Sequence, residues 1–99
     1  MAKITVADIG HEISPLLARH HVAFAGVFGS MARGEAGEAS DVDLLVRFST
    51  SKTLFQAVAL QRELSEALKR CVDLVIEASL HPLLRQRVFH DLKFFYGES

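Results

Sequence analysis

The sequence predicts a mixed α/β (α+β) fold, in which a small three-stranded sheet packs with about four helices. Three short apolar runs with few charges predict the strands. They lie at residues 22–28, 43–48 and 71–76. Longer segments with apolar residues at helical spacing predict the main helices. They lie at residues 5–20, 53–70 and 81–95. Residues 30–34 are expected to add one helical turn, and the 99-residue length predicts a single domain, 1–99.

The first predicted helix, 5–20, has Thr5 as a candidate N-terminal cap and four apolar residues at helical spacing. These are Ile9, Ile13, Leu16 and Leu17. Pro15 interrupts the pattern and leaves two alternatives. Either the helix kinks at Pro15, or a second helix begins there with Ser14 as its cap.

The two later helices are predicted from similar apolar stripes. The stripe along 53–70 consists of Leu54, Val58, Leu64 and Leu68. The stripe along 81–95 consists of Leu84, Val88, Leu92 and Phe95. Pro82 suits the first turn of this last helix, because proline is favoured there. Cys71, at the start of the third strand, is expected to be a small buried hydrophobic residue.

The composition limits the classes of function. Eleven Lys and Arg against 12 Asp and Glu give a net charge of -1. This argues against duplex nucleic acid as a partner, because binding it needs a dense basic face. A nucleotide remains compatible, since metal ions can neutralise its phosphates. The single cysteine, the lack of an evident signal peptide and the lack of an apolar run of about 20 residues favour a cytoplasmic protein without a membrane segment.

Three carboxylates predict a metal site. Asp41 and Asp43 stand two residues apart at the start of the second strand, so their side chains point to the same face. Adjacent carboxylates repel each other unless a cation lies between them, and oxygen ligands suit Mg²⁺. Asp73 lies in the otherwise apolar third strand and also needs a partner. The same metal site would provide one.

A shared site for these acids constrains the order of the strands. Gly29 and Ser30 follow the first strand, whereas Asp41 and Asp43 begin the second, so these two strands must be antiparallel to bring them together. Asp73 begins the third strand, which must therefore run parallel to the second. A parallel pair needs a long crossover, and the helix at 53–70 can supply it.

Gly29 and Ser30 are candidates for binding phosphate. Free backbone N–H groups at the start of a helical turn attract anions, and a glycine lets a phosphate approach closely. The Ser30 hydroxyl can donate a further hydrogen bond. In the simplest alternative, Ser30 is an ordinary helix cap.

These residues resemble the nucleotidyltransferase superfamily that includes DNA polymerase β. The pattern Gly-Ser-x-Ala-Arg-Gly begins at Gly29, and Ser-Asp-x-Asp-Leu-x-Val begins at Ser40. With Asp73 as a third acid, the pattern is similar to that of the minimal nucleotidyltransferases, or MNT proteins. The resemblance implies the nucleotidyltransferase fold over nearly the whole chain.

The resemblance also implies a role for each residue of the motif. Asp41 and Asp43 would bind two Mg²⁺ ions, and Asp73 would share one ion and help to deprotonate the attacking hydroxyl. Gly29 and Ser30 would hold the β- and γ-phosphates of ATP, with help from Arg33. The hydroxyl would attack the α-phosphorus and pyrophosphate would leave. The two metal ions would stabilise the attacking and leaving oxygens.

MNT proteins are typically encoded beside HEPN ribonuclease toxins, and the resemblance implies a toxin–antitoxin pair. The antitoxin would transfer AMP from ATP to a tyrosine of the toxin. Two alternatives are an antitoxin that inhibits by binding alone and a small-molecule nucleotidyltransferase. Simpler alternatives exist for the residues too: Asp41 and Asp43 in a solvated turn, Asp73 paired with a basic residue, and Arg33 in a structural role.

Overall fold

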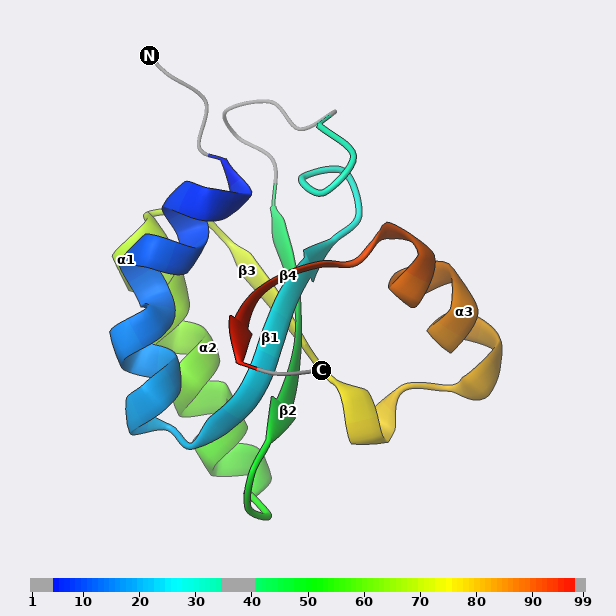
Figure 1. The fold of residues 1–99 in the computed structure, drawn as a ribbon. Helices are drawn as coiled ribbons and strands as arrows, with labels where there is room; N and C mark the ends of the chain where they lie inside the picture. The colour runs from blue at the N-terminus through cyan, green and yellow to red at the C-terminus, as the bar shows by residue number, and fades with distance from the viewer. Residues whose placement is uncertain (1–4, 35–40, 98–99) are drawn as a thin grey trace.

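The computed structural model describes residues 5–34 and 41–97, which form three α-helices, one 3-10 turn and four strands (Figure 1). In chain order the elements are α1 (Val6–Arg19), β1 (Val22–Phe28), β2 (Val42–Phe48), α2 (Leu54–Leu68), β3 (Val72–Ile76), the 3-10 turn (Glu77–Ser79), α3 (Pro82–Asp91) and β4 (Lys93–Gly97). The mixed α/β fold expected from the sequence is confirmed, with one strand more than expected.

The sheet has the strand order β3-β2-β1-β4. β1 and β2 are antiparallel, and β2 and β3 are parallel, as the placement of the acids predicted. Helix α2 connects the parallel pair, in agreement with its expected role as the crossover. The shared end of the sheet, where β1 ends and β2 and β3 begin, therefore collects the turn after β1 and the acids at the two strand starts.

The prediction of one helix over 81–95 is wrong at its C-terminal end. Helix α3 ends at Asp91, and residues 93–97 form the edge strand β4, antiparallel to β1. The predicted stripe fitted a helical period, but the segment Lys-Phe-Phe-Tyr is rich in aromatic residues, which favour strands. The edge of β1 offers its backbone groups to this segment, so tertiary pairing overrides the local pattern.

The main core lies between the sheet and one layer of two helices. Helices α1 and α2 pack side by side on one face of the sheet, and α3 lies on the other (Figure 1). The helical side chains that are completely buried in this core are Ile9, Ile13, Leu17, Leu60 and Leu64. Burial of each such side chain contributes roughly 1.5–3 kcal/mol to folding.

Helix α1 resolves the alternatives left by Pro15. It is one helix that contains Pro15, with no second helix starting at Ser14. The Thr5 side chain accepts a hydrogen bond from the Asp8 backbone N–H, and the Asp8 carboxylate accepts one from the Thr5 N–H. This reciprocal cap fixes where the helix begins, as expected for Thr5.

Helix α2 uses a different apolar stripe from the predicted one. Leu64 and Leu68 are buried as expected, but Leu54 and Val58 are 77% and 48% exposed. Ala57 and Leu60 occupy the buried positions instead. Cys71, expected to be buried, is exposed.

Helix α3 has no fully buried side chain, and ion pairs are found near both of its ends. Near its start, Arg85 contacts the buried Glu77 carboxylate, which also accepts two hydrogen bonds from Arg47 at 2.7 and 2.9 Å. At its other end, Asp91 pairs with Arg33. One ion pair thus connects α3 to the 3-10 turn after β3, and another connects its last residue to the turn after β1.

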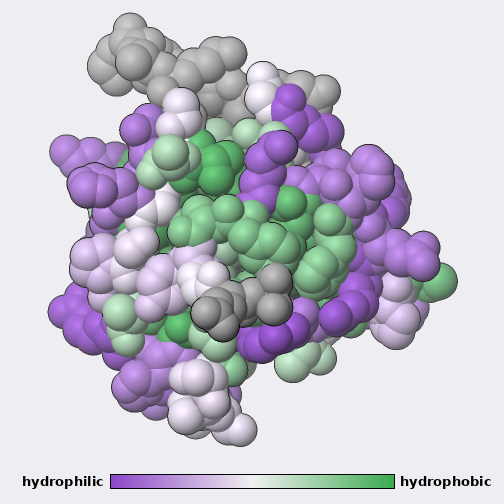
Figure 2. Space-filling model, viewed as in Figure 1, coloured by the Kyte–Doolittle hydropathy of each residue, from purple (hydrophilic) through white to green (hydrophobic). Residues whose placement is uncertain are grey.

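Figure 2 shows apolar surface gathered over β4, between the largely polar surfaces of α1 and α3. Phe94 of β4 contributes to it with an exposed fraction of 45%. In the parts of the chain that the structure describes, no helix is both long and apolar enough to cross a membrane.

Candidate active site

The chain leaves β1 through a tight turn over residues 29–34. The Arg33 N–H donates a hydrogen bond to the Gly29 carbonyl oxygen at 3.1 Å, which closes one turn of helical type. Met31 and Ala32 are buried and anchor the turn in the core, while Ser30 is half-buried. The helical turn expected at 30–34 is therefore present as a short turn rather than as a helix.

Gly29 and Asp43 are in close contact, which joins the two ends of the sequence motif. Gly29 has a φ of +76°, a conformation that favours glycine. A Cβ atom at this position would overlap the Oδ2 atom of Asp43. Asp43 can reach this place because it is the register partner of Phe28, the last residue of β1. The phosphate-binding candidate and the acidic candidate therefore belong to one site.

The acids of β2 and β3 share one face of the sheet. Asp43 and Asp73 are register partners on the two parallel strands, and partners of this kind point to the same side. Val42 and Leu44, the neighbours of Asp43, point into the core under α1 and α2. Because strand residues alternate, Asp43 and Asp73 point to the opposite face, on the side of α3.

The three acids differ in exposure. Asp43 is half-buried, whereas Asp41 and Asp73 are exposed. The sequence argument for Asp73 assumed a buried charge, and in this respect it is wrong, although the pairing of Asp73 with the strand that carries Asp43 is as expected. Asp73 is exposed at the start of β3, so its carboxyl group does not bear a large cost of burial.

Burial raises the pKa of the Asp43 carboxyl above its ordinary value. The negative charges of Asp73 and Asp41 raise this pKa further, while the positive charge of Arg33 acts in the opposite direction. The site therefore disfavours a further negative charge, and a divalent cation would relieve the repulsion. Carboxylate oxygens on a partly open surface are the donors that Mg²⁺ accepts while it keeps water or phosphate oxygens.

Within residues 5–34 and 41–97, no three His, Cys, Asp or Glu side chains already stand close enough together to hold a metal ion. The donor set fits Mg²⁺ by its chemistry, and Asp43 and Asp73 are the best placed pair. The binding of Mg²⁺ by Asp41, Asp43 and Asp73 stays a prediction.

Arg33 lies between the acids and the end of α3. Its Nη1 donates to Oδ2 of Asp91 at 2.7 Å, and its charge is near enough to lower the pKa of Asp43. Sequence reasoning missed Asp91, because 58 residues separate it from Arg33 and no motif connects them.

A cavity of about 460 Å³ lies away from the acids. It is lined by residues 47–52 and 76–79, where β2 and β3 end, and the acids stand where the same strands begin. It is therefore separate from the acidic site.

Sequence comparison places most of the chain in one family. The family model for polymerase β nucleotidyltransferases matches residues 11–99. A Methanocaldococcus jannaschii chain whose name proposes protein adenylyltransferase activity is 41% identical over 88 residues, which are 89% of this chain and 95% of that protein. The protein adenylyltransferase MntA of Thermococcus cleftensis is 36% identical over 98 residues, with 95% of this chain and 99% of the relative covered.

Solved structures of toxin–antitoxin complexes contain a similar fold. One, with AMP-PNP, matches with a TM-score of 0.81 and 27% identity over 91% of this chain and 74% of the other. Another contains a tri-AMPylated HEPN toxin of Shewanella oneidensis with its MNT antitoxin. It matches with a TM-score of 0.73 and 25% identity over 91% and 71% of the two chains. Fold, motif geometry and sequence agree, and the chain belongs to the polymerase β nucleotidyltransferase family.

Proposed function

We propose that this chain transfers AMP from ATP, with Mg²⁺, to a tyrosine hydroxyl of a HEPN ribonuclease toxin and thereby acts as its cytoplasmic antitoxin. The observation that carries the proposal is the contact of Gly29 with Asp43, with Asp73 in register beside it. One exposed face of the sheet thus presents a glycine turn and carboxylates together. The relatives named as adenylyltransferases and the complexes of MNT and HEPN proteins support the choice of group and acceptor.

The metal ions would be held by Asp41, Asp43 and Asp73. When bound, Mg²⁺ neutralises phosphate charge and stabilises charge that develops on the attacking and leaving oxygens. The half-buried Asp43 lies between the phosphate turn and Asp73, so it would be the central ligand of the set.

The remaining residues bind and orient the reactants. Gly29 lets the β- and γ-phosphates approach the backbone of the turn, Ser30 donates its hydroxyl to them, and Arg33 pairs with their charge. The tyrosine oxygen forms a bond to the α-phosphorus as the bond from that phosphorus to the bridging oxygen breaks. Pyrophosphate leaves, and the exposed Asp73 assists in removing the tyrosine proton toward solvent. Positioning and charge stabilisation supply most of the catalysis.

An acceptor as large as a protein fits the exposure of the site. Asp41, Asp73 and Arg33 are all exposed, and Arg33 pairs with the last residue of α3. A tyrosine on the surface of a second protein can reach such a face, whereas a buried site would need a channel. Inhibition by binding alone is a weaker candidate, because a pure binder gains nothing from the repulsion around Asp43.

The experiment that tests the proposal follows the α-phosphate and the γ-phosphate of ATP separately. The chain is incubated with Mg²⁺, the HEPN protein encoded beside it, and ATP labelled either on the α- or on the γ-phosphate. Label should pass to the partner from the α-phosphate only, and chelation of Mg²⁺ should stop it. Transfer of the γ-label, or of none from the wild-type chain, would contradict the proposal. Asp43→Asn should transfer no label. Its control is Glu63→Gln on α2, which lies on the other face of the sheet and should transfer label as the wild type does.

A further inference from the structure

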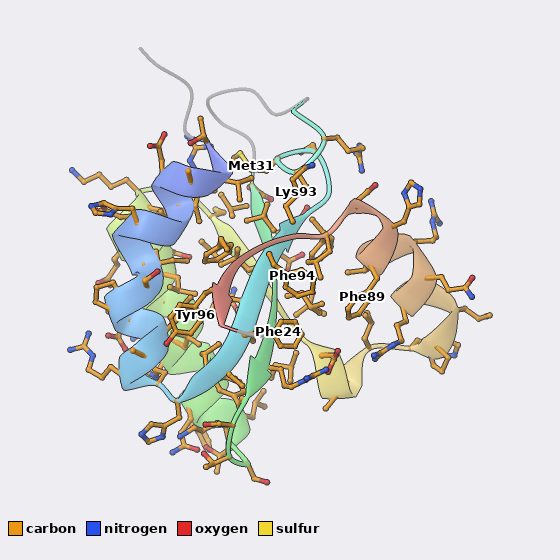
Figure 3. All side chains as sticks on the ribbon, viewed as in Figure 1. Phe24, Met31, Phe89, Lys93, Phe94 and Tyr96 are labelled. Atoms are coloured by element: carbon orange, nitrogen blue, oxygen red, sulfur yellow. The ribbon has the colours of Figure 1, made fainter. Side chains whose placement is uncertain are left out.

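Asp91 and Arg33 connect two distant parts of the chain at the candidate active site. Asp91 is the last residue of α3, and its carboxylate accepts a hydrogen bond from Arg33 Nη1 at 2.7 Å. The start of β4 follows directly, and Lys93 is the register partner of Val27, two residues before Gly29. Figure 3 shows Lys93 and Met31 at the same end of the sheet. The end of α3 is thus fixed beside the turn over residues 29–34.

The position of Asp91 is unfavourable for α3 by itself. A negative charge in the last turn of a helix opposes the helix dipole, which favours cations there. Here the hydrogen bond from Arg33, and a weaker contact with His90, lower the pKa of Asp91 and keep it ionised. The carboxylate is therefore stabilised at this place by its partners and chiefly by Arg33.

Arg33 belongs to the turn that lies against Asp43. Its backbone N–H donates to the Gly29 carbonyl oxygen at 3.1 Å, and a Cβ at Gly29 would overlap the Asp43 carboxylate. The positive charge of Arg33 also lowers the pKa of Asp43. A guanidinium has five donors in a rigid plane and can engage several acceptors at once. Its side chain also has many rotamers, and 47% of the Arg33 side chain is exposed. Without an anchor, its orientation would have to be fixed each time that a ligand binds.

We propose that Asp91 is a positioning residue of the nucleotide site, which holds the Arg33 guanidinium in place for the triphosphate. The inference rests on the proposed role of Arg33 in binding the phosphates of ATP. It adds α3 to the site, since the helix contributes to nucleotide binding through its last residue and does not touch the nucleotide. In nucleotide binding, Asp91 therefore acts through Arg33.

The test is a double-mutant cycle on nucleotide affinity. Binding of AMP-PNP with Mg²⁺ is measured by calorimetry for the wild type, Asp91→Asn, Arg33→Ala and the double variant. Asp91→Asn should weaken binding about two- to tenfold, the range for losing one pre-ordered side chain. In the Arg33→Ala background the same change should have no further effect. Asp91→Glu should restore part of the affinity, because it keeps the charge.

Two controls separate positioning from a general loss of structure. Glu63→Gln removes a carboxylate that pairs with Arg19 at 3.1 Å on α1, and it should leave the affinity unchanged. Because Asp91 also attaches α3, thermal melts of each variant accompany the titrations. If Asp91→Asn lowers the affinity equally with and without Arg33, the role of Asp91 is merely structural and the proposal is overturned.

Tighter binding by Asp91→Asn would also overturn the proposal, since Asp91 would then compete with phosphate for Arg33. AMP transfer to the partner is measured in parallel. One further outcome is that the wild type binds AMP-PNP and Asp91→Asn weakens binding only when Arg33 is present, but no AMP is transferred. The proposed function then fails and the role of Asp91 stands. If AMP is transferred but the effects of Asp91→Asn and Arg33→Ala on affinity are additive, only the proposed role of Asp91 fails.

Discussion

Asp43 and Asp73 are register partners on adjacent parallel strands, and their carboxylates share one face of the sheet with the Gly29 turn. Three segments that are far apart in the sequence meet at this place: the end of β1, the start of β2 and the start of β3. The meeting depends on a strand order with one antiparallel and one parallel pair. The chemistry proposed for the chain follows from this juxtaposition.

Replacing Asp43 by Asn should abolish AMP transfer and leave the fold intact. Burial and two neighbouring acids raise the folded-state pKa of Asp43 above 3.8, so ionisation costs the folded chain stability. This cost appears as pH rises through the raised pKa, and Asn cannot ionise. Without metal, Asp43→Asn should therefore be as stable as the wild type or more stable at neutral pH, with the difference vanishing in acid. Thermal melts of both proteins in the presence of a chelator, from acidic to neutral pH, measure this difference in stability. An unfolded variant at neutral pH would mean that Asp43 is structural.

Mg²⁺ should raise the melting temperature of the wild type. An ion that binds only the folded state adds about 2.7 kcal/mol to the free energy of unfolding at about 100 times its Kd. Asp43→Asn and Asp73→Asn should lose most of this gain, because each removes a ligand. Differential scanning fluorimetry measures the shift, with NaCl at equal ionic strength as the control for screening. An equal shift in the variants would place the ion elsewhere.

Gly29→Ala and Gly34→Ala should separate backbone strain from the contact with Asp43. Both glycines have positive φ, +76° and +74°, so an alanine at either costs about 1–2 kcal/mol. A Cβ at Gly34 has no atom of another described residue within 4 Å, whereas one at Gly29 overlaps the Asp43 carboxylate. Gly29→Ala should lose AMP transfer. Gly34→Ala should keep most of it, although the two variants should have similar melting temperatures. Equal activity of the two would show that the approach of Gly29 to Asp43 is unimportant.

Glu77→Gln should destabilise the fold without loss of AMP transfer. Arg47 and Arg85 bind the buried Glu77 carboxylate, and the hydrogen bond from Arg47 is the main cause of its lowered pKa. Loss of these charged hydrogen bonds should reduce the free energy of unfolding at pH 7 by about 1–3 kcal/mol. Urea unfolding measures the change. Glu63→Gln, at a more exposed ion pair, should cost less than about 1 kcal/mol.

The pH dependence of the Glu77 effect has a defined sign. Its folded pKa is below the ordinary 4.5, so the stabilisation is complete above that value and is lost as pH falls through the lowered pKa. The difference between the wild type and Glu77→Gln should therefore shrink in acid. A difference that stays constant down to strongly acidic pH would assign the effect to packing.

The arrangement of β1, β2 and β3 was predictable from the sequence, because the positions of the acids constrained it. Asp73 needed to meet Asp43, and only a parallel β3 with a helical crossover allows this. Strand β4 was not predicted, because its aromatic residues also fitted the helical spacing of the segment before it. The buried face of α2 includes Ala57, and a small residue of this kind gives little signal in a hydrophobic pattern.

The candidate site was predictable where it consists of local motifs and not where distant side chains meet. Gly29, Ser30, Asp41 and Asp43 lie in one stretch whose pattern marks them. The contact of Arg33 with Asp91 depends on where α3 ends and β4 begins, and this was the boundary that the sequence pattern placed incorrectly. Exposure of Asp73 was also missed, because a strand of apolar residues gives no sign of which end meets water.

Intact-mass spectrometry of the partner tests the central claim most directly. The HEPN protein is incubated with the wild-type chain, ATP and Mg²⁺, its mass is measured, and its ribonuclease activity is assayed on the same sample. We expect the partner to gain one or more AMP masses and to lose ribonuclease activity, with neither change when Asp43→Asn replaces the wild type. An unmodified partner whose ribonuclease activity is nevertheless inhibited would contradict the account and assign inhibition to binding alone.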